Sequence, residues 1–264
     1  YPENPHPSLF PDNPELYTTT HLIASRGCPF DCAYCSEKAV FSRGHRRRNP
    51  QRVVDEIEHL ADRFGMREVS FYDDLFTLHK NFVMAVCQEM IRRRLRIEWK
   101  ALSRVDTIDR DMLQAMREAG CWLISYGFES GSQQILDNIR KKQTVAQCRE
   151  AARLTRAAGI RFFGFFMIGN IGETESTIFD TLRLARDIRP DYWQFTITRP
   201  DPGSFLYHAY RDEIHVGMSS WDDYYAFARE DSRMPVVGTD LSVDQLLRYK
   251  ELAYMSLAPT HFIR

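Results

Sequence analysis

The chain alternates between short apolar runs and stretches in which apolar residues recur at helical spacing. Six runs rich in β-branched and aromatic residues predict strands at residues 18–25, 68–74, 97–103, 121–129, 160–169 and 191–198. Between them the periodicity predicts helices over residues 53–65, 80–94 and 109–120, a helical stretch that ends at 151–159, and a helix over 173–188. Each predicted strand except the last is therefore followed by a helix.

This alternation predicts an α/β fold built from parallel βαβ units. The strand runs are apolar nearly throughout, as expected when both faces of a sheet are covered. Right-handed crossovers in sequential order curl such a sheet into a partial (β/α)6 TIM-like barrel, and an open doubly wound sheet is the alternative. The barrel is favoured because the polar and glycine-bearing segments fall at the carboxyl ends of the predicted strands, where that fold carries its chemistry.

Three segments follow from this assignment. Residues 1–17 are rich in proline and asparagine and are interpreted as a linker or N-terminal extension. Residues 18–204 would form the partial barrel. Residues 205–264 are rich in aromatic side chains, and with an amphipathic helix within 242–255 they are expected to form a helical C-terminal cap.

Charge and composition limit the possible partners. The 264 residues contain 35 Lys and Arg against 36 Asp and Glu, so a net charge of -1 gives no general attraction to nucleic acid or anionic lipid. No apolar run is long enough to span a membrane, and the first residues lack a basic segment followed by an apolar one. These features predict a cytoplasmic protein with no membrane partner, for which nucleic acid is an unlikely ligand.

Three of the six cysteines are concentrated in one short segment after the first predicted strand. Cys28, Cys32 and Cys35 lie too close together for a disulfide framework and indicate a metal site. A structural zinc ion would need a fourth ligand, for which His21 or His45 is available. A four-iron, four-sulfur cluster on three thiolates is the favoured alternative, because it leaves one iron open to a ligand that is not protein.

The spacing Cys-x3-Cys-x2-Cys, with Tyr34 before the last cysteine, resembles the signature of the radical S-adenosylmethionine (radical SAM) enzymes. The resemblance extends over most of the chain, to segments similar to blocks of the branch in which a cobalamin-binding domain precedes the radical domain: 71–77, 103–106, 126–132, 164–174 and the C-terminal tail. The segment GNIGET departs from the usual Gly-Leu-Pro-Gly-Glu-Thr, and the missing proline bears on the rigidity of that turn.

The resemblance implies a role for each matching position. Cys28, Cys32 and Cys35 would bind the 4Fe-4S cluster, with S-adenosylmethionine on the fourth iron. Tyr34 would lie against the adenine, and the backbone around Ile168 and Gly169 would hold the edge of that base. Glu129 and Ser130 would contact the ribose hydroxyls, and Thr198 is a further cofactor-binding candidate.

Three charged residues at strand ends have two possible roles each. Asp73 and Asp74 would hydrogen-bond the methionyl ammonium, or they would cap the helix that follows. Arg104 would pair with the methionyl carboxylate, or it would form a surface ion pair. Glu173 is expected to be an acidic residue at a helix start, where the helix dipole favours it.

The resemblance implies an enzyme that reductively cleaves S-adenosylmethionine to a 5′-deoxyadenosyl radical. That radical would abstract hydrogen from an unreactive C–H bond of a small-molecule substrate, for methyl transfer or for ring formation or rearrangement. Cobalamin would be bound by a domain absent from this chain, because no Asp-x-His-x-x-Gly motif is present. A methylthiotransferase acting on tRNA or protein and a non-enzymatic zinc-stabilised nucleic-acid module are the alternatives.

An electron donor such as flavodoxin or ferredoxin is the expected protein partner. The basic run at residues 43–48 follows the cysteine segment and would meet either an anionic substrate or such a donor. A second basic run at 92–96 ends a predicted helix, where cations complement the helix dipole.

Overall fold

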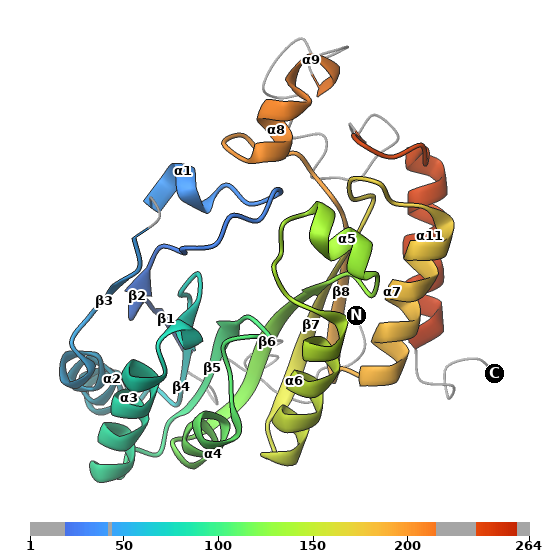
Figure 1. The fold of residues 1–264 in the computed structure, drawn as a ribbon. Coiled ribbons are helices and arrows are strands. Elements are labelled where there is room, and N and C mark those ends of the chain that lie inside the picture. The colour runs from blue at the N-terminus through green and yellow to red at the C-terminus, as the bar shows by residue number, and fades with distance from the viewer. Residues whose placement is uncertain (1–18, 42–43, 215–235, 258–264) are drawn as a thin grey trace. The chain divides into compact units, whose positions relative to one another are not determined.

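The computed structural model describes residues 19–41, 44–214 and 236–257. Its main sheet has six strands in the order β1-β4-β5-β6-β7-β8, and their succession can be followed in Figure 1. The strands are β1 (Thr19–Leu22), β4 (Glu68–Phe71), β5 (Glu98–Ser103), β6 (Cys121–Glu129), β7 (Arg161–Ile168) and β8 (Tyr192–Ile197). This order follows the chain without the reversal that defines a doubly wound sheet, so the doubly wound alternative is wrong and the predicted six-stranded parallel α/β fold is confirmed.

The described residues divide into two compact units, and each is considered by itself. The first contains residues 19–27, 45–126 and 154–162. The second contains the described residues within 28–44, 127–153 and 163–257. Strand β6 crosses from one unit to the other after Tyr126.

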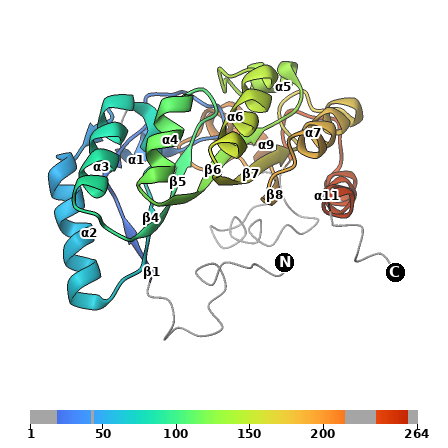
Figure 2. The same ribbon diagram turned by 90° about the horizontal axis from the view of Figure 1, so that it is seen from below.

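The first unit packs helices against β1, β4, β5 and the start of β6. Its helices are α2 (Pro50–Phe64), α3 (Lys80–Arg92) and α4 (Arg110–Glu118), and α3 and α4 lie along one face of β4 and β5 in Figure 2. The core is aromatic: Phe71 stacks on Phe76 at 4.5 Å, and both contact Trp99. Trp99 is fully buried, and its indole N–H donates to the Ala119 carbonyl at 2.8 Å, so the ring fills the core without leaving a polar atom unpaired.

The second unit contains the end of β6, most of β7, and β8. Its helices include α5 (Gln133–Asn138), α7 (Glu175–Ile188) and α11 (Val243–Leu257), while α6 (Val145–Ala157) belongs partly to each unit. Phe128, Phe166 and Phe195 stack in succession across the three strands. Helix α11 packs on β8 and α7, and the Tyr254 hydroxyl accepts from the Phe195 amide at 3.3 Å.

Local sequence explains where several helices begin. The Asn49 side chain accepts from the Arg52 amide ahead of α2, with Pro50 as the first helical residue. Asp109 caps α4 in the same way through the Met112 amide at 3.0 Å. Thr174 and Thr177 cap each other at the start of α7.

Two local features differ from the sequence prediction. The strand expected over 18–25 ends at Leu22, and Ser25–Arg26 form a separate strand, β2, antiparallel to β3 (Arg46–Arg47). Short helices that the periodicity did not predict are present: α1 (Glu37–Phe41), α8 (Phe205–Ala209), α9 (Arg211–Ile214) and the single turn Phe76–Leu78. They are too short to show a helical hydrophobic period.

The linker expected at 1–17 lies outside the described residues, as do residues 215–235 and 258–264 of the expected cap. The described parts of 205–264 are helical in α8, α9 and α11. Among residues 19–41, 44–214 and 236–257, no helix combines the length and apolar character needed to cross a bilayer.

Candidate functional site

The three clustered cysteines lie on the loop between β2 and α1. Cys28, Cys32 and Cys35 are all half-exposed, and none of them forms a disulfide bond. The Cys35 amide donates to the Cys32 carbonyl at 3.1 Å, which makes a tight turn between the second and third thiols. The loop therefore presents three thiols at the surface of the second unit's fold, from residues 28, 32 and 35.

Ala33 anchors the middle of this loop through both of its backbone polar groups. Its amide donates to the Ile139 carbonyl at 2.8 Å, just after α5, and its carbonyl accepts from the Leu206 amide of α8 at 2.9 Å. The Ala33 side chain is fully buried. Because both hydrogen bonds come from helices distant in sequence, the loop backbone is fixed by packing rather than by its own local turns.

Tyr34, the residue before Cys35, holds this end of the loop against α5. Its ring packs on Ile135, Leu136 and Ile139 of the α5 region. Its hydroxyl donates to the Glu129 carboxylate at 2.9 Å and accepts from the Lys141 ammonium at 3.0 Å. Burial, followed by the nearby Glu129 charge, raises the pKa of the Tyr34 hydroxyl well above its usual value. Tyr34 thus stays a neutral donor, and the predicted stacking on adenine remains a prediction.

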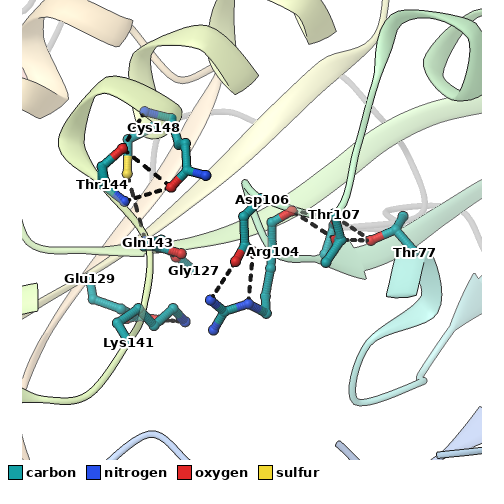
Figure 3. A network of polar contacts seen from close by, with 12 residues as sticks. Thr77, Arg104, Asp106, Thr107, Gly127, Glu129, Lys141, Gln143, Thr144 and Cys148 are labelled. Carbon is teal, nitrogen blue, oxygen red and sulfur yellow. Dashed lines mark hydrogen bonds and ion pairs between the residues drawn. The ribbon is translucent and has the colours of Figure 1, made fainter. Parts of the chain in front are cut away.

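Glu129 and Lys141 form a buried ion pair beside the cysteine loop (Figure 3). Their charged atoms are 2.7 Å apart, and only 7% of the Glu129 side chain and 6% of the Lys141 side chain are exposed. Glu129 has a left-handed backbone with φ of 61°, which is uncommon outside glycine and costs of order 1–3 kcal/mol. Strained, buried and charged residues of this kind cluster at functional sites, which makes this ion pair a candidate part of one.

Gly127 makes room for this ion pair. A Cβ atom there would lie 2.3 Å from Glu129 Oε1 and 2.9 Å from Lys141 Nζ. A glycine at a strand end can let backbone approach a ligand, but here the space beside it is filled by the protein's own charged pair. Lys141 was not identified from the sequence, where it is one of two adjacent lysines with no motif around it.

The donor set fits an iron–sulfur cluster. Three cysteine thiols on one anchored, half-exposed loop are the ligands that such clusters take. Burial, and to a smaller extent the neighbouring Cys32 and Cys28 thiols, raise the pKa of Cys35 to about 11. Bound iron would lower that pKa, because it stabilises the thiolate form.

A single zinc ion receives no support. The two histidines considered as a fourth ligand have other neighbours: His21 packs edge-on against Tyr72, and His45 hydrogen-bonds the Leu75 carbonyl at 3.3 Å.

Asp73 and Asp74 bind the backbone that leads into the cysteine loop. Asp73 accepts from the Ala24 amide at 2.9 Å and from the Ser25 hydroxyl, while Asp74 accepts from the Gly27 amide at 2.6 Å. Neither caps a helix, so that expectation is wrong: α3 begins after His79. Burial raises the pKa of Asp73 to about 6.

Arg104 is held by an acidic neighbour. Its guanidinium forms a two-pronged ion pair with Asp106 at 2.8 and 2.9 Å (Figure 3). The Arg104 side chain is only 7% exposed, so this is a buried pair rather than the surface pair considered from the sequence. Its predicted contact with the methionyl carboxylate remains a prediction.

The remaining predicted cofactor contacts already make internal hydrogen bonds. The Ser130 hydroxyl lies 3.0 Å from that of Thr181, and the Ile168 carbonyl accepts from the Thr198 amide at 2.8 Å. Gly169 has a positive φ of 78° and lies against Leu246 of α11.

The turn after β7 is braced by side chains in place of the missing proline. Asn170 donates to the Met167 carbonyl at 3.1 Å and to Glu173 at 2.9 Å, and it accepts from the Thr198 hydroxyl at 2.7 Å. Glu173 was expected at a helix start, but it is buried ahead of α7 and accepts from Thr177 at 2.7 Å. Burial raises the pKa of Glu173.

Parallel strands wound in chain order and three clustered thiols define an α/β domain with a sulfur-ligand centre. The radical SAM superfamily profile matches residues 22–185, which is more than half of the 264 residues. The chain belongs to the radical SAM superfamily, as its motifs indicated. Enzymes of this superfamily use a 4Fe-4S cluster and S-adenosylmethionine.

Two relatives are named for methyl transfer and for ring closure. It is 36% identical over 204 residues to an uncharacterized methyltransferase of Pyrococcus horikoshii, covering 77% of this chain and 44% of the relative. It is 37% identical over 196 residues to the anaerobic magnesium-protoporphyrin IX monomethyl ester cyclase of Cereibacter sphaeroides, covering 73% of this chain and 32% of the relative.

A solved structure shares the fold. The radical S-adenosylmethionine methyltransferase TsrM from Kitasatospora setae, with cobalamin and a 4Fe-4S cluster bound, matches with a TM-score of 0.70 at 21% identity. The match covers 79% of this chain and 40% of that one. The chain thus spans less than half the length of each of these three proteins.

Proposed function

We propose that this chain is the radical-generating part of an enzyme that transfers a methyl group to a small molecule or closes a ring in it. Cys28, Cys32 and Cys35 would hold the 4Fe-4S cluster. When bound, this cluster supplies the electron that cleaves S-adenosylmethionine to methionine and a 5′-deoxyadenosyl radical. The observation that carries the proposal is the anchored loop with three clustered thiols on a chain of this superfamily.

The chain's own residues set the geometry of that loop. Lys141 acts as a positioning residue, because its ammonium contacts both the Tyr34 hydroxyl and the Glu129 carboxylate. Glu129 would contact the ribose hydroxyls of the nucleotide, as the resemblance to the family implies. The buried pair keeps both side chains in one conformation before any ligand arrives, and this lowers the entropy lost on binding.

The substrate class comes from the relatives. TsrM has been solved with its substrate tryptophan and an analogue of S-adenosylmethionine, and the Cereibacter relative is a cyclase named for a magnesium porphyrin ester. We therefore propose a small organic substrate with an unreactive C–H bond. For methyl transfer, cobalamin is the carrier we propose, and the TsrM structure contains it.

The test uses anaerobic reconstitution with iron and sulfide, followed by dithionite and S-adenosylmethionine labelled in its methyl group. The expected result is a brown protein that releases 5′-deoxyadenosine, detected by mass spectrometry. A labelled methyl group on a product would show methyl transfer, a labelled methylthio group would show methylthiolation, and an unlabelled product two hydrogens lighter would show ring closure.

Single cysteine variants provide the matched control. Cys32→Ala should abolish iron binding and cleavage, because the loop would lose one of three ligands. Cys148→Ala removes a fully buried thiol in α6 and should leave both intact. A colourless zinc protein, or cleavage that survives Cys32→Ala, would overturn the proposal.

A further inference from the structure

The antiparallel pair of strands β2 and β3, called the hairpin below although residues 27–45 connect its strands, carries a cluster of arginines without acidic partners among the described residues. Arg26, Arg46 and Arg47 are all exposed. Among the described residues, none of their guanidinium groups forms an ion pair or a side-chain hydrogen bond. The hairpin therefore concentrates positive charge on a chain whose net charge is only -1.

The cross-strand register brings two of these charges, those of Arg26 and Arg46, together on one face of the ladder, and Arg47 lies next to them along the strand. Arg26 pairs directly with Arg46, and Ser25 with Arg47, in an antiparallel ladder of only two residue pairs. Like charges directly opposite each other destabilise a ladder, and so short a ladder has few other contacts to offset that cost. An anionic surface placed against the hairpin would attract these guanidinium groups and so offset the repulsion between them.

The acidic side chains around the hairpin already have other partners. Asp73 and Asp74 accept hydrogen bonds from the backbone of residues 24 and 27. Glu56 pairs with Arg48, whose guanidinium also donates to the Ile23 carbonyl at 3.1 Å. Among the described residues, the exposed charges of Arg26, Arg46 and Arg47 are thus left without an acidic partner.

The arginines surround a hollow close to the cysteines in the chain. A cavity of about 350 Å³ is lined by residues 23–26 and 46–48. Arg26 precedes Cys28 by two residues. At about 3.8 Å for each residue, their Cα atoms lie within about 8 Å of each other in any arrangement of the chain. A protein docked on the hairpin would therefore come close to the thiol loop.

We infer that the β2–β3 hairpin is the docking surface for an acidic one-electron donor protein, an inference that rests on the proposed function. Charge complementarity favours an acidic partner. Because Arg26 lies close to Cys28, a donor docked on the hairpin would also lie close to the cluster. One electron passes from the reduced donor to the cluster, so the donor is oxidised and the cluster reduced by one electron each. No atom or proton needs to cross this surface.

The experiment compares two reductants on the anaerobically reconstituted full protein. Dithionite is a small ion that needs no docking surface, whereas NADPH with flavodoxin reductase and flavodoxin requires protein contact. In Arg46→Glu/Arg47→Glu, 5′-deoxyadenosine formation driven by flavodoxin should fall by about tenfold or more, and formation driven by dithionite should stay within about twofold. Added salt should slow the flavodoxin reaction of the unsubstituted protein and have little further effect on the variant.

The matched control is Arg67→Glu/Arg96→Glu, which makes the same change in charge. These residues are exposed and precede β4 and β5, at the amino ends of their strands. The control should keep the flavodoxin-driven rate within about twofold of the unsubstituted protein. An equal loss in control and hairpin variant would show a general charge effect and overturn the inference.

Other outcomes also decide the matter. A hairpin variant that keeps its flavodoxin-driven rate refutes the docking surface. A raised KM for S-adenosylmethionine under dithionite would assign the hollow to that ligand instead. If Arg46→Glu/Arg47→Glu fails to fold, the neutral Arg46→Gln/Arg47→Gln takes its place with the same expected contrast. If the unsubstituted protein forms no 5′-deoxyadenosine with dithionite, the proposed function itself is refuted.

Discussion

Removing the Lys141 ammonium while keeping its bulk, as in Lys141→Met, tests the central ion pair. With an effective dielectric constant of about 20, unit charges 2.7 Å apart attract by about 6 kcal/mol. The variant loses this attraction but still pays to bury the Glu129 charge, which is 7% exposed. Breaking a buried pair from one side usually costs about 3–5 kcal/mol, and we expect a loss of unfolding free energy in that range.

The assay is urea unfolding of the apoprotein, followed by circular dichroism, for four proteins: the unsubstituted chain, Lys141→Met, Glu129→Gln and the double variant. The double variant buries no charge, so it should be more stable than Lys141→Met alone.

The neighbouring lysine offers a matched control. Lys142 is exposed, so Lys142→Met makes the same chemical change without breaking a buried pair and should alter stability by less than about 0.5 kcal/mol. The reasoning is refuted if Lys141→Met lies within about 1 kcal/mol of the unsubstituted protein, or if the double variant is no more stable than the single one.

Three further changes test other contacts. A folded Asp73 pKa of about 6 in place of 3.8, at about 1.4 kcal/mol per pH unit, favours the protonated form by about 3 kcal/mol. Protonated Asp73 therefore contributes to the free energy of unfolding in full below about pH 4, and this contribution is lost as the pH rises through 6. Asp73→Asn should make the free energy of unfolding, measured with urea, depend less on pH over this range. Gly131→Ala would place a Cβ 2.2 Å from the Asp180 carbonyl and should lower the unfolding free energy by about 1–3 kcal/mol; an unchanged midpoint would contradict the close packing. Asn49→Ala removes the cap of α2 and should cost about 1 kcal/mol in the same assay, whereas Asn49→Gly should cost only a few tenths.

The sheet could be predicted from the sequence because its strands are buried and its helices amphipathic. The strand predicted over 121–129 coincides with β6, and the helix predicted over 109–120 differs from α4 only at its ends. Hydrophobic period carries this information locally. The split of the first predicted strand could not be foreseen, because Ser25–Arg26 pair with Arg46–Arg47, and that pairing depends on where the chain returns twenty residues later.

The site was predicted only where its chemistry is written into a local spacing. Three cysteines within eight positions indicate a metal centre from the sequence alone. Asp73 and Asp74 were correctly placed after a strand, but their acceptors are used by the backbone amides of residues 24 and 27 and by the Ser25 hydroxyl. Hydrogen bonds of this kind depend on tertiary packing, and side-chain identity does not reveal them.

The segment around Gly127 shows how a binding motif can serve the protein's own structure. A glycine two residues before a strand-end glutamate leaves space that a ligand could enter. In this protein the Lys141 ammonium, twelve residues past Glu129, occupies that space. A side chain at position 127 would displace that ammonium and leave Glu129 and Tyr34 without their shared partner. The glycine therefore acts on the cysteine loop through Lys141 and Tyr34, so we expect both Gly127→Ala and Lys141→Met to lower the iron content of the protein after anaerobic reconstitution.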